Sequence, residues 1–251
     1  MEEFDVPKSH PRYESLRTRH RIEAGVDRGI TSRAGLIAHG RGEAFDYLLG
    51  EETIESAEAA ERVAAARLLR ADRPVISVNG NAAALVPAAL VELAEATGAA
   101  LEVNLFHRTD ERMRAIADHL RDHGAIDVKG LEADARIPGL DHDRALVDAD
   151  GIHAADVVLV PLEDGDRAAA LAEMGKVEIV VDLNPLSRSA RVADVPVIDN
   201  IVRAVPAMTA HARELAEAGP AELDRIVEQF DAQETRRAAE RRLREGSPEG
   251  R

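Results

Sequence analysis

The chain has 251 residues, a formal net charge of −15 and no cysteine or tryptophan. Without cysteine it cannot form a disulfide, a thiolate nucleophile or a thiolate-ligated zinc site. With four phenylalanines, two tyrosines and a strongly negative charge, it is poorly suited to binding nucleic acid. The length fits one α/β domain, or one domain with helical additions at both ends.

No apolar stretch reaches the roughly 18 residues of a membrane span, and residues 1–4 are acidic where a signal peptide is basic. We therefore expect a cytoplasmic protein with no membrane partner. Nearly all the cations are arginines, since lysine occurs only at positions 8, 129 and 176. An acidic, lysine-poor surface is suited to concentrated salt, where charges are screened within about 3 Å at 1 M. We expect a halophilic protein.

Residues 1–72 predict a helical segment that packs on the core and contributes to the site. A first helix follows Ser9, and Thr31 or Ser32 caps the second. The second helix is expected to be interrupted or to end around Gly40–Gly42, because glycine costs roughly 0.8–1 kcal/mol relative to alanine in a helix interior. Residues 43–49 would form a further helical piece. Apolar residues with helical spacing then run from 54 to about 70.

The glycines on both sides of Arg41 predict either close approach of a ligand or another backbone, or simply a turn between two helices.

Residues 73–200 alternate short β-branched runs with helical stretches, which is typical of a parallel sheet covered on both faces. The expected strands lie at 74–80, 100–106, 125–128, 156–160, 178–181 and 197–198. The expected helices lie at 84–97, at 166–174 and after Thr109. The predicted fold class is α/β, a Rossmann-like parallel sheet with N-terminal and C-terminal helical additions, and 73–200 is its nucleotide-binding core.

Two segments complete the chain. Residues 132–151 are rich in aspartate, have no clear period and predict either an inserted loop or a lid. Residues 201–251 predict two long C-terminal helical tracts, at about 200–218 and 220–244, followed by a charged tail that we expect to fray.

Polar residues follow the expected strands, at the edge where open parallel sheets bind ligands. Asn79 and Asn81 follow the first strand, and Asn104 precedes a His107–Arg108 pair after the second. Further polar clusters lie at 163–167, 182–191 and 199–200. Each cluster alone is also ordinary turn chemistry, but their position at one end of one sheet favours a binding site.

The sequence contains neither of the two common glycine-rich nucleotide-binding motifs, the phosphate loop and G-x-G-x-x-G. These motifs therefore do not identify the ligand of this site. Arginines instead occupy loops and helix starts, where a planar guanidinium binds phosphate or carboxylate through two hydrogen bonds. They are Arg12, Arg19, Arg41, Arg108, Arg167 and Arg188. The alternative is a solvated arginine paired with nearby acids. The acidic run Glu163–Asp166 suits Mg²⁺ held with substrate phosphates, or is a turn in an acid-rich chain.

Long motifs in this chain resemble the archaeal 4-phosphopantoate:β-alanine ligases, also called phosphopantothenate synthetases. They lie at 8–13, 35–47, 74–87, 102–108, 158–167 and 182–191, and the resemblance covers roughly residues 7 to 230. It implies a homodimer with a Rossmann-like core. It also implies that 4-phosphopantoate and β-alanine are joined at the expense of ATP, giving 4-phosphopantothenate, AMP and diphosphate on the route to coenzyme A.

The resemblance also implies nucleotide ligands at matching positions. These are Arg19, Arg41, Asp182, Leu183, Asn184, Arg188, Ser189, Asn200 and Ile201. It places 4-phosphopantoate near the adenylate, and from their position after strands we assign its anchors to Asn79, Asn81, Asn104, His107 and Arg108.

The expected chemistry is an acyl-adenylate mechanism, with arginines and Mg²⁺ neutralising the phosphate charge. His39 or His107 could then accept the proton of the β-alanine amine, although a structural hydrogen-bonding role is an equal alternative for either. Two other functions fit the same core: a kinase or other nucleotide-dependent transferase, which would release ADP, and a non-catalytic nucleotide sensor.

Overall fold

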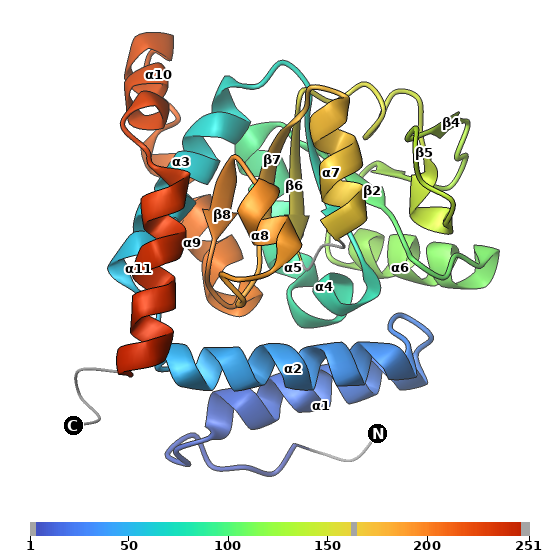
Figure 1. The fold of residues 1–251 in the computed structure, drawn as a ribbon. Helices are drawn as coiled ribbons and strands as arrows, with labels where there is room; N and C mark the ends of the chain where they lie inside the picture. The colour runs from blue at the N-terminus through green and yellow to red at the C-terminus, as the bar shows by residue number, and fades with distance from the viewer. Residues whose placement is uncertain (1–3, 162–164, 247–251) are drawn as a thin grey trace.

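A six-stranded parallel sheet forms the centre of the molecule in the computed structural model, which describes residues 4–161 and 165–246 (Figure 1). The strand order is β3-β2-β1-β6-β7-β8. The strands are β1 (Pro74–Val78), β2 (Ala100–Val103), β3 (Val128–Lys129), β6 (Val157–Pro161), β7 (Val177–Val181) and β8 (Val195–Val197). The order reverses between β1 and β6, where Ile76 lies opposite Leu159. A doubly wound sheet opens its ligand crevice beyond the carboxyl ends of the strands at such a reversal.

Both faces of this sheet are buried, which explains why its strands read as nearly continuous apolar runs. Along β1, Ile76 and Val78 belong to the main core with α3 (Glu55–Arg70), α5 (Pro87–Thr97), α6 (Asp110–Asp122) and α9 (Ile201–Glu214). Val75 faces the other side, in a second core with α7 (Gly165–Glu173) and residues of the 137–155 region. The predicted α/β class with a parallel sheet covered on both faces is confirmed.

Two N-terminal helices, α1 (Tyr13–Asp27) and α2 (Arg33–Leu49), pack on each other and cross the lower edge of the core in Figure 1. The predicted interruption at Gly40–Gly42 is wrong, because α2 is one continuous helix. Ser32 caps its start by accepting from the Gly35 backbone N–H, and Gly50, at φ 105°, ends it in the left-handed region. Tertiary packing of the whole helix therefore outweighs the propensity cost of its glycines.

The predicted helix at 84–97 consists of two helices. A short α4 (Gly80–Leu85) begins directly after β1 and precedes α5. The prediction missed its first turn, because Asn79 reads as turn chemistry but acts as the N-cap of α4. Pro87 then starts α5, since proline is tolerated in the first turn of a helix but not in its interior.

The 132–151 segment is a packed insertion. It contains β4 (Ala135–Arg136), the 3₁₀ turn Asp143–Ala145 and β5 (Leu146–Val147), with β4 and β5 antiparallel. Buried Glu102 of β2 accepts hydrogen bonds from the backbone N–H groups of Asp148 (3.1 Å) and Ile152 (2.5 Å). The segment is thus tied to the sheet by a carboxyl side chain as well as by its apolar residues.

Three helices follow the last strand where the sequence predicts two tracts. They are α9, α10 (Pro220–Glu228) and α11 (Ala232–Glu245). The second tract breaks before Asp231, whose carboxylate caps α11 at the Gln233 and Glu234 N–H groups, 2.9 Å from each. No helix among the described residues is long and apolar enough to span a bilayer. The division at 72 and 200 stays a prediction.

Candidate functional site

A cavity of about 840 Å³ lies between α2 and the carboxyl edge of the sheet. Its walls come from α2, from the loops after β1, β2 and β7, and from the start of α7, the helix that follows β6. Those loops join strands on both sides of the reversal in strand order, so the cavity lies where a doubly wound fold is expected to bind its ligand. Nine residues predicted for the site line it: Arg41, Asn79, Asn81, His107, Asp182, Leu183, Asn184, Arg188 and Ser189.

Asn79 lies at the reversal itself. Its side-chain N–H donates to the Pro161 carbonyl at the end of β6 (2.8 Å), while its oxygen accepts from the Ala82 N–H (3.0 Å) as the cap of α4. The side chain therefore joins the ends of the two central strands. It fixes the floor of the cavity with both of its polar atoms.

Asn81 attaches α2 to this floor. Its Nδ2 donates to the Gly35 carbonyl (2.9 Å), and its Oδ1 accepts a hydrogen bond from the Thr31 hydroxyl. A Cβ on Gly35 would lie within 2.5 Å of both Asn81 and Thr31 oxygens, so only glycine allows this approach. A close approach was expected at the glycines beside Arg41, but in α2 it occurs at Gly35, which was not predicted.

One face of α2 forms the wall opposite the sheet, through Ala34, Gly35, Ala38, Arg41, Gly42 and Phe45, at helical spacing. A Cβ on Gly42 would be in ordinary contact with Leu183 (3.5 Å), and one on Gly40 would meet nothing within 4 Å. The two glycines therefore do not require a close approach of backbone. Their position leaves Arg41 on the face that lines the cavity.

The loop after β7 is held by its own polar side chains. Asp182 accepts from the Asn184 N–H (3.0 Å), and Ser187 caps α8 (Arg188–Val192) by accepting from the Ala190 N–H (3.0 Å). Burial raises the pKa of Asp182, an effect that hydrogen bonds from Ser187 and Asn184 and the nearby Arg41 charge only partly offset. A poorly solvated carboxyl beside a guanidinium is suited to hydrogen-bonding a ligand hydroxyl or amino group.

The described residues of the cavity lining carry more positive than negative charge, although the chain is strongly negative. Arg41, Arg112, Arg144, Arg188 and His107 line it, against the carboxylates of Asp166 and Asp182. No ion pair or hydrogen bond between described residues involves the guanidinium of Arg41 or Arg188. The start of α7 also meets the start of α8, because a Cβ on Gly165 would lie 2.5 Å from that of Arg188. Guanidiniums and helix N-termini together favour a phosphorylated ligand.

The wall from the loop after β2 contains an aromatic group. The Phe106 ring stacks on the His142 ring (centroids 5.0 Å apart, planes 28° apart) and meets the His107 ring edge-on at 4.9 Å. His142 Nε2 lies 3.0 Å from a carboxylate oxygen of Asp166 at the start of α7. Hydrogen bonds from His142 and from backbone N–H groups lower the pKa of Asp166, although burial acts in the opposite direction.

Two predicted nucleotide ligands, Asn200 and Ile201, lie at the start of α9 and are not among the residues that line the cavity. Asn200 caps α9 at the Val202 N–H (3.2 Å) and donates to Asp46 of α2 (2.7 Å). Ile201 is buried in the main core.

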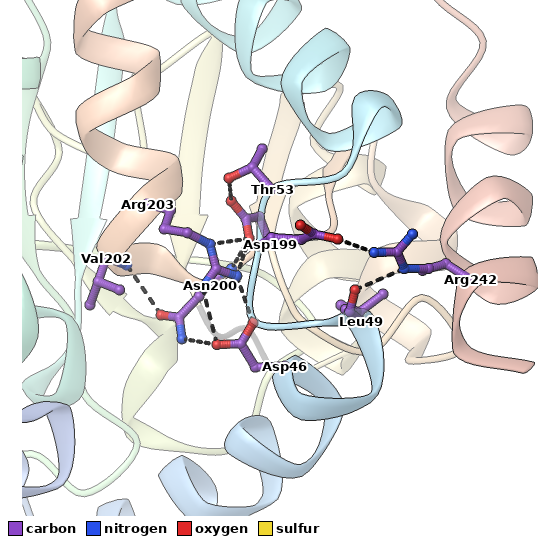
Figure 2. Close-up of polar contacts among 9 residues, drawn as sticks. Asp46, Leu49, Thr53, Asp199, Asn200, Val202, Arg203 and Arg242 are labelled. Atoms are coloured by element: carbon purple, nitrogen blue, oxygen red, sulfur yellow. Dashed lines mark hydrogen bonds and ion pairs between the residues drawn. The ribbon is translucent and has the colours of Figure 1, made fainter. Parts of the chain in front are cut away.

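Beside Asn200, Arg203 donates to Asp46 (2.6 Å) and to Asp199 (2.5 Å). We call Asp46, Asp199, Asn200 and Arg203 the α2–α9 clamp. Thr53 donates to the second oxygen of Asp199 (2.7 Å), and Figure 2 shows these side chains converging between α2 and α9.

Arg19 and His39 lie between α1 and α2, away from the cavity lining. Arg19 is 45% exposed and forms a two-bonded ion pair with Glu43 at 2.7 Å. Nε2 of His39 is buried without a partner among the described residues, and burial lowers the pKa of this imidazole. Their predicted roles in nucleotide binding and proton transfer stay predictions.

Asn104 and Arg108 hold the inserted segment rather than lining the cavity. Asn104 is buried and donates to the carbonyls of Arg144 (3.2 Å) and Leu146 (3.1 Å). Arg108 donates through its backbone N–H to Asp143 (3.0 Å) and through its guanidinium to the Leu131 carbonyl (3.2 Å). Of the predicted acidic run, Glu163 and Asp164 lie outside the described residues.

Several cavity residues were not predicted. Arg112 donates to the carbonyls of His107 (2.8 Å) and Ile30 (3.4 Å), and burial lowers its pKa. Its place in the first turn after the Thr109 cap was a readable signal for a helix-start arginine. Arg144 comes from the insertion, which carries no periodicity that would have directed it to the site. His142, also from the insertion, is outside the lining but contacts its residues Phe106 and Asp166.

Comparison with known proteins gives a consistent result. The sequence model of the family described as phosphopantothenate/pantothenate synthetase matches residues 56–246. The 4-phosphopantoate–β-alanine ligase of Thermococcus onnurineus (strain NA1) is 59% identical over 227 residues, 90% of this chain and 87% of that protein. The ligase of the same name from Methanosarcina mazei is 54% identical over 231 residues, 92% of this chain and 91% of that protein. That of Methanospirillum hungatei JF-1 is 60% identical over 200 residues, 80% of this chain and 82% of that protein.

Proposed function

The chain belongs to the phosphopantothenate/pantothenate synthetase family, and from that premise we propose that it is an ATP-dependent ligase that joins 4-phosphopantoate to β-alanine in coenzyme A biosynthesis. The observation that carries the proposal is the cation-lined cavity of about 840 Å³ at the reversal in strand order. Two of the three substrates carry phosphate and the third a carboxylate, so a positive cavity in a negative protein matches their charge.

The nucleotide side of the cavity is proposed to lie along the β7 loop and α2. Asp182, Leu183 and Asn184 would contact ribose or adenine, and Arg41 with Arg188 and Ser189 would contact phosphate. The support is their common position on the cavity wall and the lack of a carboxylate partner for the two arginines among the described contacts. Asn200 and Arg19 remain proposed nucleotide ligands.

The 4-phosphopantoate side is proposed to lie along the loops after β1 and β2. Asn79, Asn81 and His107 line the cavity there. Asn104 and Arg108 would act on the substrate through the Arg144 segment that they hold. His107 is the better placed of the two proposed proton acceptors, because it lines the cavity and His39 does not.

The proposed chemistry has two steps. The carboxylate oxygen of 4-phosphopantoate attacks the α-phosphorus of ATP, an O–P bond forms, and diphosphate leaves. The neutral amine of β-alanine then attacks the acyl carbon, a C–N bond forms, and AMP leaves with the electrons of the acyl C–O bond. The nitrogen gives up its extra proton to His107, the proposed acceptor. Arg41 and Arg188 would stabilise the charge on the phosphates without moving during the reaction.

We propose that Mg²⁺ arrives with ATP. Magnesium bound to a nucleotide takes most of its oxygens from phosphates and water and needs only one or two protein carboxylates. In the described ranges 4–161 and 165–246, no group of three or more His, Asp and Glu side chains is gathered to hold a metal. Asp182, in the loop proposed for the nucleotide, is the cavity carboxylate that could complete its shell.

We further propose that two copies associate, because α2 exposes large apolar side chains: Leu36, Ile37, Tyr47 and Leu48, with Ile37 78% exposed.

We propose that the reaction takes place in the cytoplasm, where ATP is available. The acidic, lysine-poor composition supports activity in concentrated salt; a melting curve unchanged between dilute buffer and molar KCl would contradict that.

The identity of the nucleotide product tests the function. The protein is incubated with ATP, Mg²⁺, 4-phosphopantoate and β-alanine in molar KCl, and the products are separated. AMP and diphosphate should accumulate in equal amounts, and only when both 4-phosphopantoate and β-alanine are present. Release of ADP would indicate a kinase or other transferase, and binding of ATP without turnover would indicate a sensor.

A further inference from the structure

The charges around the cavity are unequal, and this bears on one substrate group in particular. Among the described residues that line it, four arginines and His107 stand against two carboxylates, Asp166 and Asp182. ATP and 4-phosphopantoate bring only negative charge to this cavity. β-Alanine brings a carboxylate and an ammonium group, and an ammonium ion among guanidiniums needs a carboxylate beside it.

Asp182 is poorly suited to that role. It already accepts from the Asn184 N–H (3.0 Å), it faces Arg41, and burial disfavours its charged form. It also lies in the loop that leads into Arg188 and α8, on the wall proposed above for the nucleotide.

The Asp166 carboxylate is fixed by hydrogen bonds and is still accessible from the cavity. One oxygen faces His142 Nε2 (3.0 Å) and the other accepts from the Arg167 N–H (3.0 Å), yet the side chain is 52% exposed and lines the cavity. A carboxylate oxygen accepts more than one hydrogen bond, so the carboxylate keeps acceptor capacity toward the cavity.

His142 is fixed in turn by its surroundings. Its side chain is 20% exposed, its ring stacks on Phe106, and its Nδ1 is buried with no partner among the described residues. Within the described ranges the ring therefore has one polar side-chain contact, with Asp166, and its plane is set by the stacking on Phe106. Phe106 is 46% exposed on the cavity wall beside it, which gives an apolar surface next to the carboxylate.

We propose, on the basis of the ligase function proposed above, that Asp166 is the residue that binds the ammonium group of β-alanine, and that His142 is its positioning residue. The two methylene groups of β-alanine then lie against Phe106. The inserted segment, whose Arg144 already lines the cavity, thereby also supplies part of the amino-acid site through His142.

The test separates the two half-reactions. In the absence of β-alanine, the full-length protein with ATP, Mg²⁺ and 4-phosphopantoate should exchange labelled diphosphate into ATP. Asp166→Asn should exchange at nearly the normal rate, while its KM for β-alanine rises roughly 10- to 100-fold, the loss expected for one charge-assisted hydrogen bond. Normal exchange also shows that the variant is folded. Asp118→Asn, at an exposed aspartate of α6, is the matched control and should change neither quantity.

Two further measurements distinguish ammonium binding from a general structural effect. 3-Hydroxypropionate, which carries a hydroxyl where β-alanine has its ammonium group, should compete with β-alanine weakly in the unmodified protein. In Asp166→Asn the inhibition constant of 3-hydroxypropionate should stay nearly the same while the KM for β-alanine rises. The ratio of the inhibition constant to that KM should therefore fall by about the factor of the rise. His142→Asn should raise the KM for β-alanine by a smaller factor and leave exchange intact.

An unchanged KM for β-alanine in Asp166→Asn with normal exchange would overturn this inference alone. Loss of exchange in that variant, restored by excess Mg²⁺, would also overturn it and make Asp166 a metal ligand. Absence of exchange in the unmodified protein would overturn the ligase mechanism and this inference together.

Discussion

Arg203, the arginine of the α2–α9 clamp, and the arginines of the cavity are chemically identical but have opposite surroundings. In the clamp, Arg203 contacts the carboxylates of Asp46 and Asp199, and both acids are buried (Figure 2). In the cavity, Arg41 and Arg188 have no carboxylate partner among the described contacts. A paired guanidinium joins helices, whereas one that faces a cavity without a partner is available to an anionic ligand.

The same comparison explains the position of α2. This helix carries Asp46 toward the clamp and Arg41 toward the cavity. Residues 41 and 46 are five apart, or about 140° around a helix with 3.6 residues per turn, so they lie on different faces. The clamp thus fixes one end of α2, while another face of the same helix presents Arg41, a proposed nucleotide-binding residue, to the cavity.

Removing the cation of the clamp should cause the largest loss of stability. Arg203→Met leaves Asp46 and Asp199 buried without their cation, which is expected to cost about 3–5 kcal/mol of unfolding free energy. Denaturant unfolding at constant salt measures it. Arg62→Met, at an exposed ion pair with Glu214, is the control and should leave the midpoint nearly unchanged. A loss no larger than that of the control would mean that the clamp contributes nothing.

The cavity should show the reverse behaviour, a loss of activity without a loss of stability. Arg41→Ala removes a guanidinium proposed to contact phosphate, so kcat/KM for ATP should fall roughly 10- to 100-fold. The midpoint of unfolding should stay the same, because the side chain is exposed and alanine favours helix. Arg33→Ala, at an exposed position of the same helix outside the cavity lining, is the control. Normal turnover in Arg41→Ala would refute its assigned role.

A smaller and pH-dependent effect is expected beside the clamp. Glu61 of α3 is fully buried, and burial together with the Asp199 carboxylate raises its pKa well above the ordinary value of 4.5. Above pH 4.5 the unfolded chain ionises while the folded protein keeps the proton, so this group costs more stability as the pH rises. Glu61→Gln removes that cost and should stabilise the protein by up to about 1.4 kcal/mol for each pH unit above 4.5.

Unfolding of both proteins at pH 5 and pH 7 measures this gain. The unmodified protein and Glu61→Gln should have nearly equal stability near pH 4.5. At higher pH the variant should be the more stable of the two, by a margin that grows with pH. A difference that does not change with pH would mean that Glu61 is not protonated in the folded protein.

Much of the fold was predictable because it depends on local patterns. The apolar runs at Val157–Pro161 and Val177–Val181 predict strands buried on both faces, and the Thr109 cap predicts the start of α6. The patterns failed where tertiary packing outweighed propensity. Gly40 and Gly42 read as a break, but α2 continues through them.

The site was predictable to the extent that it depends on strand ends. Asn79, Asn81, His107 and the Asp182–Ser189 loop follow strands, so the edge of the sheet brings them to one cavity. Arg112 and Arg144 were missed, and Asn104 and Arg108 were predicted but hold the insertion in place. Sequence reports that a residue lies near the edge, but not which way its side chain points.

The sequence by itself therefore determined the parallel sheet, the edge that carries the site and the family. Those properties follow from the period of the apolar residues and from long unbroken motifs, and both are read along the chain. Only the tertiary structure decided that Arg203 is paired, whereas Arg41 has no ion-pair partner in the described part of the chain. It also decided that Asn200 joins the clamp and that His142 from the insertion meets Asp166. Such pairings depend on distances between segments up to about 150 residues apart, which packing sets and local propensity does not.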